Sequence, residues 1–312
     1  MGNVITTKKA EGGKWALLIA LIVLGIIFSG NIFAKDLRKL REKSIDVKSG
    51  EKLVVSTPVA DVNIRTWDKD QFNIIIYGNS KAEDRMEFSI EKTSYGVKVK
   101  GEKNSSWLSN LFGSNIQAKF DIMVPRNFQL DISTSGGDIT VGNLSGFKKL
   151  HTSGGDIELS NTDGELEVKT SGGDIKVHKN KGLASLETSG GDIIVKECTG
   201  NLDAETSGGD LDVELNEGKV SLGTSGGDIK LNYSGENKGI KLSTSGGDIT
   251  AWLPSSIKAD AELVSTGGDV TCRIKSANTG KYSSHRFIGT LNGGGAKLTA
   301  RTTGGEIIIK EK

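Results

Sequence analysis

The chain lacks a strong net charge. Its 40 basic residues are balanced by 39 acidic residues, so the formal net charge is +1. This balance gives no field that would attract nucleic acid or an anionic surface. Aromatic residues are scarce, at 5%, and there are only three prolines and two cysteines. The 42 glycines and the 35% apolar content favour many short strands with tight corners and exclude a disordered chain.

The N-terminal segment has a composition of its own. The run from Trp15 to Phe28 is apolar, the stretch stays uncharged to Ala34, and lysines precede it. Residues 1–34 are therefore predicted to be a secretory signal peptide or an uncleaved membrane anchor spanning 15–34. Cleavage after Ala34 favours a released or surface module, whereas retention favours a tethered one. Residues 35–43 form a basic linker, which leaves the membrane orientation open.

The rest of the chain repeats the stretch TSGGDI or a close copy of it. The acidic residue of this motif recurs at a regular interval of about 18 residues up to Asp228, and at longer intervals after it. The series is Asp138, Asp156, Asp174, Asp192, Asp210, Asp228, Asp248, Asp269 and Glu306. A fixed period is typical of repeat architectures, in which each copy is one structural unit.

Apolar residues occupy alternate positions on both sides of the motif. Counting from the acidic residue, positions +1, +3 and −6 are apolar in all copies, and position −8 is apolar except at Lys148. Alternation with a period of two predicts two short strands per repeat, each with one inward face. The SGG stretch makes the corner between them, and a second glycine at −10 marks another corner in many copies.

These features predict an all-β fold, a single-stranded β-solenoid with rungs of about 18 residues each. A rung is one turn of the coil, and stacked rungs share a core that one rung cannot form alone. Residues 131–312 are the regular solenoid, with a side loop at 275–295 that could cover its far end. Residues 44–130 form irregular rungs and a cap, because Thr57 and Asp61 keep the repeat's offset. The threonine at −4 is predicted to bond to the corner of the neighbouring rung.

The chain resembles a family that is known mostly as a domain of unknown function. The TSGGDI repeats, the stretch VNIRTWDKDQFNI and the ending GGGAKLTARTTGGEIIIK are similar to the bacterial "putative adhesin" family of β-strand repeat proteins, over residues 45–312. The resemblance implies a right-handed β-helix in the cell envelope. It implies no catalytic or cofactor-binding residues.

The row of aspartates is the sharpest candidate for a site. Eight aspartates and Glu306 at one corner would place like charges about one strand spacing apart, which raises pKa values unless something compensates. One interpretation is that each carboxylate accepts hydrogen bonds from amides of its own corner. The other is a cation ladder along Asp138, Asp156, Asp174, Asp192, Asp210, Asp228, Asp248 and Asp269, although each turn supplies only one carboxylate.

No constellation of catalytic residues stands out, so we predict that the chain is not an enzyme and binds no cofactor. The carboxylates are periodic, whereas catalysis needs a pair with distinct environments. His151, His178 and His285 are scattered and are predicted to be solvated surface residues. Cys272 is predicted in the core and Cys198 near a corner. About four rungs, near 20 Å, would separate the two thiols, so no disulfide is expected between them.

The outward positions carry mixed charges, which disfavours nucleic acid as a partner. One cluster is exceptional: Trp107, Leu108, Leu111 and Phe112 lie among turn-forming residues. They form either a flap over the first rung or an exposed contact patch. Trp67 is predicted to be a corner residue.

The predicted function is a non-enzymatic module of the cell envelope, adhesin-like or a structural scaffold, that presents a repetitive surface. Its partner would be a protein or a glycan of the envelope, with the membrane added if residues 15–34 stay uncleaved. The alternatives are a membrane-tethered component of envelope-stress regulation and a carbohydrate-active β-helix.

Overall fold

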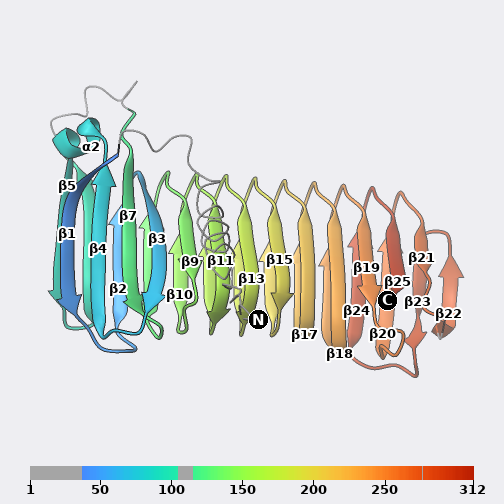
Figure 1. Cartoon of the computed structure of the whole chain (residues 1–312). Coiled ribbons are helices and arrows are strands. Elements are labelled where there is room, and N and C mark those ends of the chain that lie inside the picture. The colour runs from blue at the N-terminus through green and yellow to red at the C-terminus, as the bar shows by residue number, and fades with distance from the viewer. Residues whose placement is uncertain (1–36, 105–114, 276) are drawn as a thin grey trace, which may run out of the picture. The chain divides into compact units, whose positions relative to one another are not determined.

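The computed structural model describes residues 37–104, 115–275 and 277–312. Within residues 38–312 the strands stand side by side in a long row, and all 25 belong to one hydrogen-bonded network (Figure 1). Among the residues that the structure describes, the one helix is α2 (Ser80–Arg85), which has six residues and is capped by Asn79. The prediction of an all-β, solenoid-like repeat fold is therefore confirmed.

The predicted signal peptide or membrane anchor at 1–34 lies outside the described residues. Among the residues that are described, no helix has the length and apolar character needed to cross a membrane.

The repeats build two sheets that meet at the TSGGD corner. The pre-corner sheet holds the strands that end at the corner threonine, and the post-corner sheet holds those that follow the aspartate. Central strands of the pre-corner sheet are β8 (Gln129–Thr134), β10 (Lys148–His151), β12 (Leu166–Lys169), β14 (Ala184–Glu187) and β16 (Leu202–Glu205). Those of the post-corner sheet are β9 (Ile139–Gly142), β11 (Ile157–Asp163), β13 (Ile175–Lys181) and β15 (Ile193–Cys198). The longer β17 (Leu211–Gly223) and β18 (Ile229–Ser243) continue through the second corner and belong to both sheets.

Neighbouring strands in the central repeats pair in parallel with equivalent residues opposite each other. Ile175 lies between Ile157 and Ile193, and all three are fully buried. The inward residues at +1, +3, −6 and −8 therefore stack into columns that fill the space between the two sheets. This shared interior is the hydrophobic core that the alternating pattern predicts.

The corner threonines form the hydrogen-bonded ladder that the sequence predicts. Thr152 Oγ1 donates to the carbonyl oxygen of Gly137 in the preceding rung at 3.0 Å and accepts from the N–H of Gly155 in its own corner at 3.3 Å. The same pair of bonds recurs at Thr170, Thr188, Thr206, Thr224, Thr244 and Thr302. Each threonine thereby ties one corner to the next without exposing a buried hydroxyl to an apolar core.

The last repeats do not stack in chain order. The strands concerned are β19 (Ile249–Leu253), β20 (Ala259–Ser265), β21 (Val270–Cys272), β24 (Lys297–Thr302) and β25 (Ile307–Glu311). β25 pairs with β19 on one side and β21 on the other, and β24 lies between β18 and β20 (Figure 1). The C-terminal rung is therefore inserted inside the stack, between two rungs that are consecutive in the chain.

The first repeats show the same departure from chain order. Their strands are β2 (Lys52–Thr57), β3 (Ala60–Trp67), β6 (Gly96–Lys103) and β7 (Ala118–Pro125). β2 pairs with β6 and β8, and β3 pairs with β7 and β9. The rung that comes first in the sequence therefore lies second in the stack. Asp61 occupies the aspartate position of this rung, because its Oδ1 accepts the N–H of Asp138 at 3.1 Å.

Antiparallel strands cover both ends of the stack. At the N-terminal end they are β1 (Arg38–Asp46), β4 (Gln71–Gly78) and β5 (Met86–Thr93), and at the C-terminal end β22 (Ala277–Ser283) and β23 (Arg286–Leu291). β4 pairs with β7, β1 with β4, β5 with β6, and β23 with β20. Within the insertion at 275–295, for which the sequence suggests a side loop or cover, β22 and β23 form a β-hairpin that pairs with β20. Such covers limit edge-to-edge association.

The interpretation of residues 35–43 as a linker needs correction. Arg38–Lys43 belong to β1, which pairs with β4 from Arg38 to Asp46. Most of β1 is exposed, so its charged side chains remain in water while its backbone bonds to the sheet. The charged sequence showed no strand pattern, because an edge strand whose side chains face water needs few apolar residues.

Lys148 is the one charged residue in the inward column at −8, and its side chain is fully buried. Its Nζ donates to the carbonyl oxygens of Gly146 at 2.5 Å and Asp163 at 2.8 Å. Burial disfavours the charged ammonium and lowers the pKa of Lys148 to about 8, although Asp163 opposes the shift. The ammonium is therefore hydrogen-bonded but still costly to bury.

Replacing Lys148 with methionine should stabilise the protein at pH 7 by about 1–2 kcal/mol, because burial of the charge ends while two hydrogen bonds are lost. The pKa of Lys148 is lower in the folded protein than in the unfolded chain. The loss of stability caused by burying its ammonium is therefore complete below pH 8 and decreases as the pH rises toward 10.5. The gain should shrink over that window, as measured by urea unfolding of both proteins at several pH values. A gain that is the same at pH 7 and pH 10 would contradict the assignment.

Candidate functional site

The aspartate row forms a continuous chain of hydrogen bonds along one corner. Oδ1 of Asp138 accepts the backbone N–H of Asp156 at 2.8 Å, and the next bonds in the row have lengths between 2.8 and 3.0 Å. The acceptors continue through Asp156, Asp174, Asp192, Asp210 and Asp228 to Asp248, which accepts the N–H of Glu306. The sequence interpretation was wrong in one respect: each carboxylate bonds to the next rung, not to its own corner.

The structure also corrects the order of the row at its C-terminal end. Asp248 bonds to Glu306 rather than to Asp269, because β25 is inserted between β19 and β21. Each aspartate thus compensates its charge with an amide dipole of its neighbour, which is a structural role. Within the described residues, no group of three or more His, Cys, Asp or Glu side chains has the arrangement of a metal site.

The cation ladder stays a hypothesis that a substitution can test. Asp210→Asn keeps an oxygen acceptor for the N–H of Asp228 and should change the free energy of unfolding by less than about 0.5 kcal/mol. Asp210→Ala leaves that N–H without its acceptor and should destabilise by about 1 kcal/mol. Thermal unfolding with and without Ca²⁺ measures both effects. A calcium-dependent rise in Tm that Asp210→Asn reduces would support cation binding instead.

The other predicted residues lie apart from one another. His151, His178 and His285 are exposed, as predicted, and His178 Nε2 lies 3.0 Å from Glu197 Oε1. Cys198 is buried and Cys272 is half-buried, and both are free thiols. Trp67 ends β3 and donates its indole N–H to the carbonyl of Gln71. The contact patch of Trp107, Leu108, Leu111 and Phe112 lies outside the described residues.

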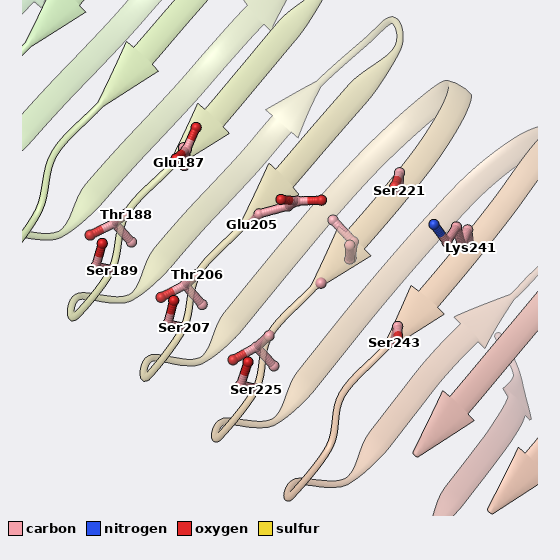
Figure 2. A pocket seen from close by; sticks show the side chains of 13 residues that line it. Glu187, Thr188, Ser189, Glu205, Thr206, Ser207, Ser221, Ser225, Lys241 and Ser243 are labelled. Atoms are coloured by element: carbon pink, nitrogen blue, oxygen red, sulfur yellow. The ribbon is translucent and has the colours of Figure 1, made fainter. Parts of the chain in front are cut away.

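A groove on the pre-corner sheet is a site that the sequence analysis missed. It has a volume of about 380 Å³ and crosses β14, β16, β17 and β18 next to the TSGG corners (Figure 2). Figure 2 shows Glu187, Glu205, Ser221 and Lys241 on successive strands of this face. The remaining lining is mostly corner serines and threonines. A second hollow of about 440 Å³ adjoins it, shares Ser221 and Lys241, and is lined by Leu183, Asp203 and Lys219 among others.

The charges around the groove differ from those on the rest of the same sheet. Away from the groove, outward charges pair along the sheet, in Lys52–Asp131 at 2.7 Å, Lys149–Glu167 at 2.6 Å and Arg301–Glu262 at 2.9 Å. Glu187, at the edge of the groove, also pairs, with Lys169 at 2.5 Å. At the groove, Asp203 and Glu205 on β16, Lys219 on β17 and Lys241 on β18 have no ion-pair partner within the part of the chain that the structure describes. The groove therefore presents unpaired charges of both signs.

The hollow arises from small side chains at outward positions. Ser185, Ser221, Gly223 and Ser243 stand where other repeats carry long charged residues such as Lys149 and Lys169. Carboxylates, hydroxyls and ammonium groups around a hollow can accept and donate hydrogen bonds to a polar partner. This interruption of the outward pattern was the signal in the sequence. Because strands of the two sheets alternate along the chain, the interruption is visible only when the outward residues of one sheet are compared with one another.

Comparison with known proteins agrees with this architecture. The family model described as Toastrack DUF4097 matches residues 50–310. No protein with a curated description matches the chain.

Several solved structures are similar to the chain, and three are representative. A "putative cell adhesion protein" from Clostridium sporogenes is 14% identical, with 88% of this chain and 100% of that chain covered and a TM-score of 0.21. A "putative adhesin" from Bacteroides fragilis is 11% identical, with 89% and 98% covered and a TM-score of 0.36. A "putative lipid binding protein" from Parabacteroides distasonis is 10% identical, with 89% and 98% covered and a TM-score of 0.45.

The family match spans nearly all of the described residues, and it includes every repeat of the aspartate row. The chain belongs to the Toastrack DUF4097 family, which agrees with the adhesin-like repeat family that its motifs resemble.

Proposed function

We propose that this protein is a non-enzymatic module of the cell envelope, adhesin-like or scaffolding, that binds its partner through the pre-corner sheet. In this proposal the chain is a right-handed, single-stranded β-helix whose rungs have about 18 residues each. Stacked rungs hold outward side chains at intervals of about 4.8 Å. A partner would be recognised by this spacing together with the groove, and it would be a protein or a glycan of the envelope.

The observation that carries the proposal is the interruption of charge pairing at the groove. A surface that contacts only water needs no hollow, and its opposite charges can pair along the sheet as they do at Lys149 and Glu167. Asp203, Glu205, Lys219 and Lys241 instead line the groove or the hollow that adjoins it without pairing to one another. Unpaired charges around a concave surface are a feature of sites that a partner completes.

Binding to isolated cell envelopes tests the proposal. The variant Asp203→Asn/Glu205→Gln should bind at least about five-fold more weakly than the unmodified protein, because charge complementarity at the groove is lost. Glu158→Gln/Glu214→Gln is the matched control, since it removes two carboxylates from outward positions of the post-corner sheet. Equal loss with both pairs, or no loss with either, would refute a binding role for the groove. Protease treatment and periodate oxidation of the envelopes distinguish a protein partner from a glycan.

The envelope location in this proposal depends on the apolar segment at 15–34. Mass spectrometry of the mature protein decides between cleavage after Ala34 and retention of the segment. Cleavage would support a released or surface module, and retention a membrane-tethered one.

A further inference from the structure

We infer that the groove face of the pre-corner sheet is a self-complementary surface, on which the partner is a second copy of this chain. The inference builds on the proposed function, since it names a partner for the same face. β17 lies at the centre of this face, with β16 and then β14 on one side and β18 and then β24 on the other. The two sides carry opposite charges, so the face can match itself across a two-fold axis.

The register shows how the charges are divided. On one side of β17, the outward residues of β14 and β16 include Glu187, Asp203 and Glu205. On the other side, those of β18 and β24 include Lys241 and Arg301. The acidic side and the basic side are therefore separated by β17, whose outward residues at these two levels, Ser221 and Gly223, are small.

A two-fold axis that lies between two facing copies, parallel to β17, exchanges the two sides and keeps the strands parallel. Ser221 has Asp203 opposite it on β16 and Lys241 opposite it on β18. Asp203 of one copy then faces Lys241 of the other, and the same contact forms a second time on the opposite side of the axis. Both residues are exposed and without an ion-pair partner in the described structure.

The same axis also places β14 of each copy opposite β24 of the other copy, again with an acidic residue against a basic one. Glu205 has Glu187 opposite it on β14, and Ser243 has Arg301 opposite it on β24. Because Glu205 and Ser243 flank Gly223 at the same level, the axis places Glu187 of one copy against Arg301 of the other. Within each copy Glu187 already pairs with Lys169 and Arg301 with Glu262, so this outer contact extends existing ion pairs, and the unpaired Asp203 and Lys241 carry the complementarity. Opposite charges therefore meet on both strands on each side of the axis.

The residues at the axis allow two sheets to approach. Ser221 and Gly223 are small, so no large side chain keeps the sheets apart at the centre. The hollow beside Ser221 leaves room for the long side chain of Lys241 from a second copy to reach Asp203. Lys219 also lies on β17 and faces its counterpart in the second copy across the axis; the Asp203 carboxylates, which line the same hollow, offset this like charge. Such pairing contributes more to specificity than to affinity.

The size of the patch sets the expected strength. Five strands at a spacing of about 4.8 Å and five residues at about 3.3 Å each give an area of about 400 Å² per copy. This is about half of what a standard-size interface buries per partner. We therefore expect weak association that weakens further with salt and becomes significant where many copies are held close together.

Charge exchange between two variants tests the pairing. Asp203→Lys places two lysines opposite each other in both central contacts, and Lys241→Glu places two acidic residues there. Each variant alone should self-associate at least about ten-fold more weakly than the unmodified full chain in detergent, by sedimentation velocity over a range of concentrations. An equimolar mixture of the two should associate again, because both contacts then join opposite charges. Both sites are exposed, so circular dichroism should show an unchanged fold.

Cross-linking tests the position of the axis. Ser221→Cys places a thiol beside it, so mild oxidation should give a covalent dimer, whereas Ser160→Cys on the post-corner sheet is the matched control and should not. The unmodified chain controls for the native thiols Cys198 and Cys272.

A monomer at every concentration, with no cross-link at Ser221→Cys, would overturn the inference, as would mixed charge variants that fail to associate. Neither result affects the proposed envelope function, because binding is measured with the protein dilute enough to be monomeric and with envelopes from cells that lack this chain. Loss of envelope binding in Asp203→Asn/Glu205→Gln therefore reports on the envelope partner and not on the dimer.

Discussion

Gly173→Ala should destabilise the protein by at least about 3 kcal/mol. An alanine Cβ at this corner would lie 2.0 Å from the carbonyl oxygen of Gly155 and 2.5 Å from its carbonyl carbon. Both atoms are backbone of the preceding rung, so they cannot rotate away as a side chain would. The same oxygen accepts the hydroxyl of Thr170 at 3.0 Å, so moving it would also disturb the threonine ladder.

The adjacent glycine provides the control for this prediction. A Cβ at Gly172 would lie 3.7 Å from the nearest atom, the carbonyl oxygen of Ser153, which is ordinary van der Waals contact. Gly172→Ala should therefore change the free energy of unfolding by less than about 1 kcal/mol. Urea unfolding of both variants, followed by circular dichroism, measures the difference. Similar losses for the two glycines would show that backbone entropy, not the close approach of rungs, explains the motif.

Deletion of residues 296–312 should remove an internal rung and lower the free energy of unfolding by more than about 5 kcal/mol, since large buried aliphatic side chains contribute about 1.5–3 kcal/mol each. Leu298, Ala300, Ile307 and Ile309 are fully buried in the intact protein. The loss also separates β20 and β21 from the rungs that they pack against.

Hydrogen exchange distinguishes this result from loss of an outer rung. β19 pairs with β25 in the intact protein, so the amides of Ile249–Leu253 should exchange much faster in the deletion variant. If the rungs stacked in chain order, β21 would keep β19 covered and its protection would not change. Ile307→Ala and Ile308→Ala form a matched pair in the full chain, since Ile307 is buried and Ile308 is partly exposed. Only the first should lower Tm by several degrees.

The stacking order could not be predicted from the repeats, and the reason is physical. Each copy places the same kinds of side chain at +1, +3, −6 and −8, so any copy fits against any other in the same register. Ile307 packs beside Ile249 as well as Val270 would. The hairpin β22–β23 between Cys272 and Lys297 gives the chain enough length to pass the last rung and return. The packing of the whole chain, rather than the local sequence pattern, therefore selects the stacking order of the rungs.

Much of the interior followed directly from the alternation of residues. The buried columns through Ile157, Ile175 and Ile193, the corner glycines and the threonine ladder are where the period places them, because side chains in a strand alternate between two faces. Lys148 is buried for the same reason, since its position in the period outweighs its charge.

The sequence by itself determined the rungs, the direction in which each side chain points and the repeated corner. The tertiary structure decided which rungs are neighbours, that Arg38–Lys43 form an edge strand, and that each aspartate bonds to the next rung. It also decided that Asp203, Glu205, Lys219 and Lys241 gather around two adjoining hollows. Local periodicity controls the rungs, the side-chain directions and the corners because it acts within one strand. The order of the rungs, the edge strand, the aspartate bonds and the hollows depend on contacts between segments that are distant in the chain.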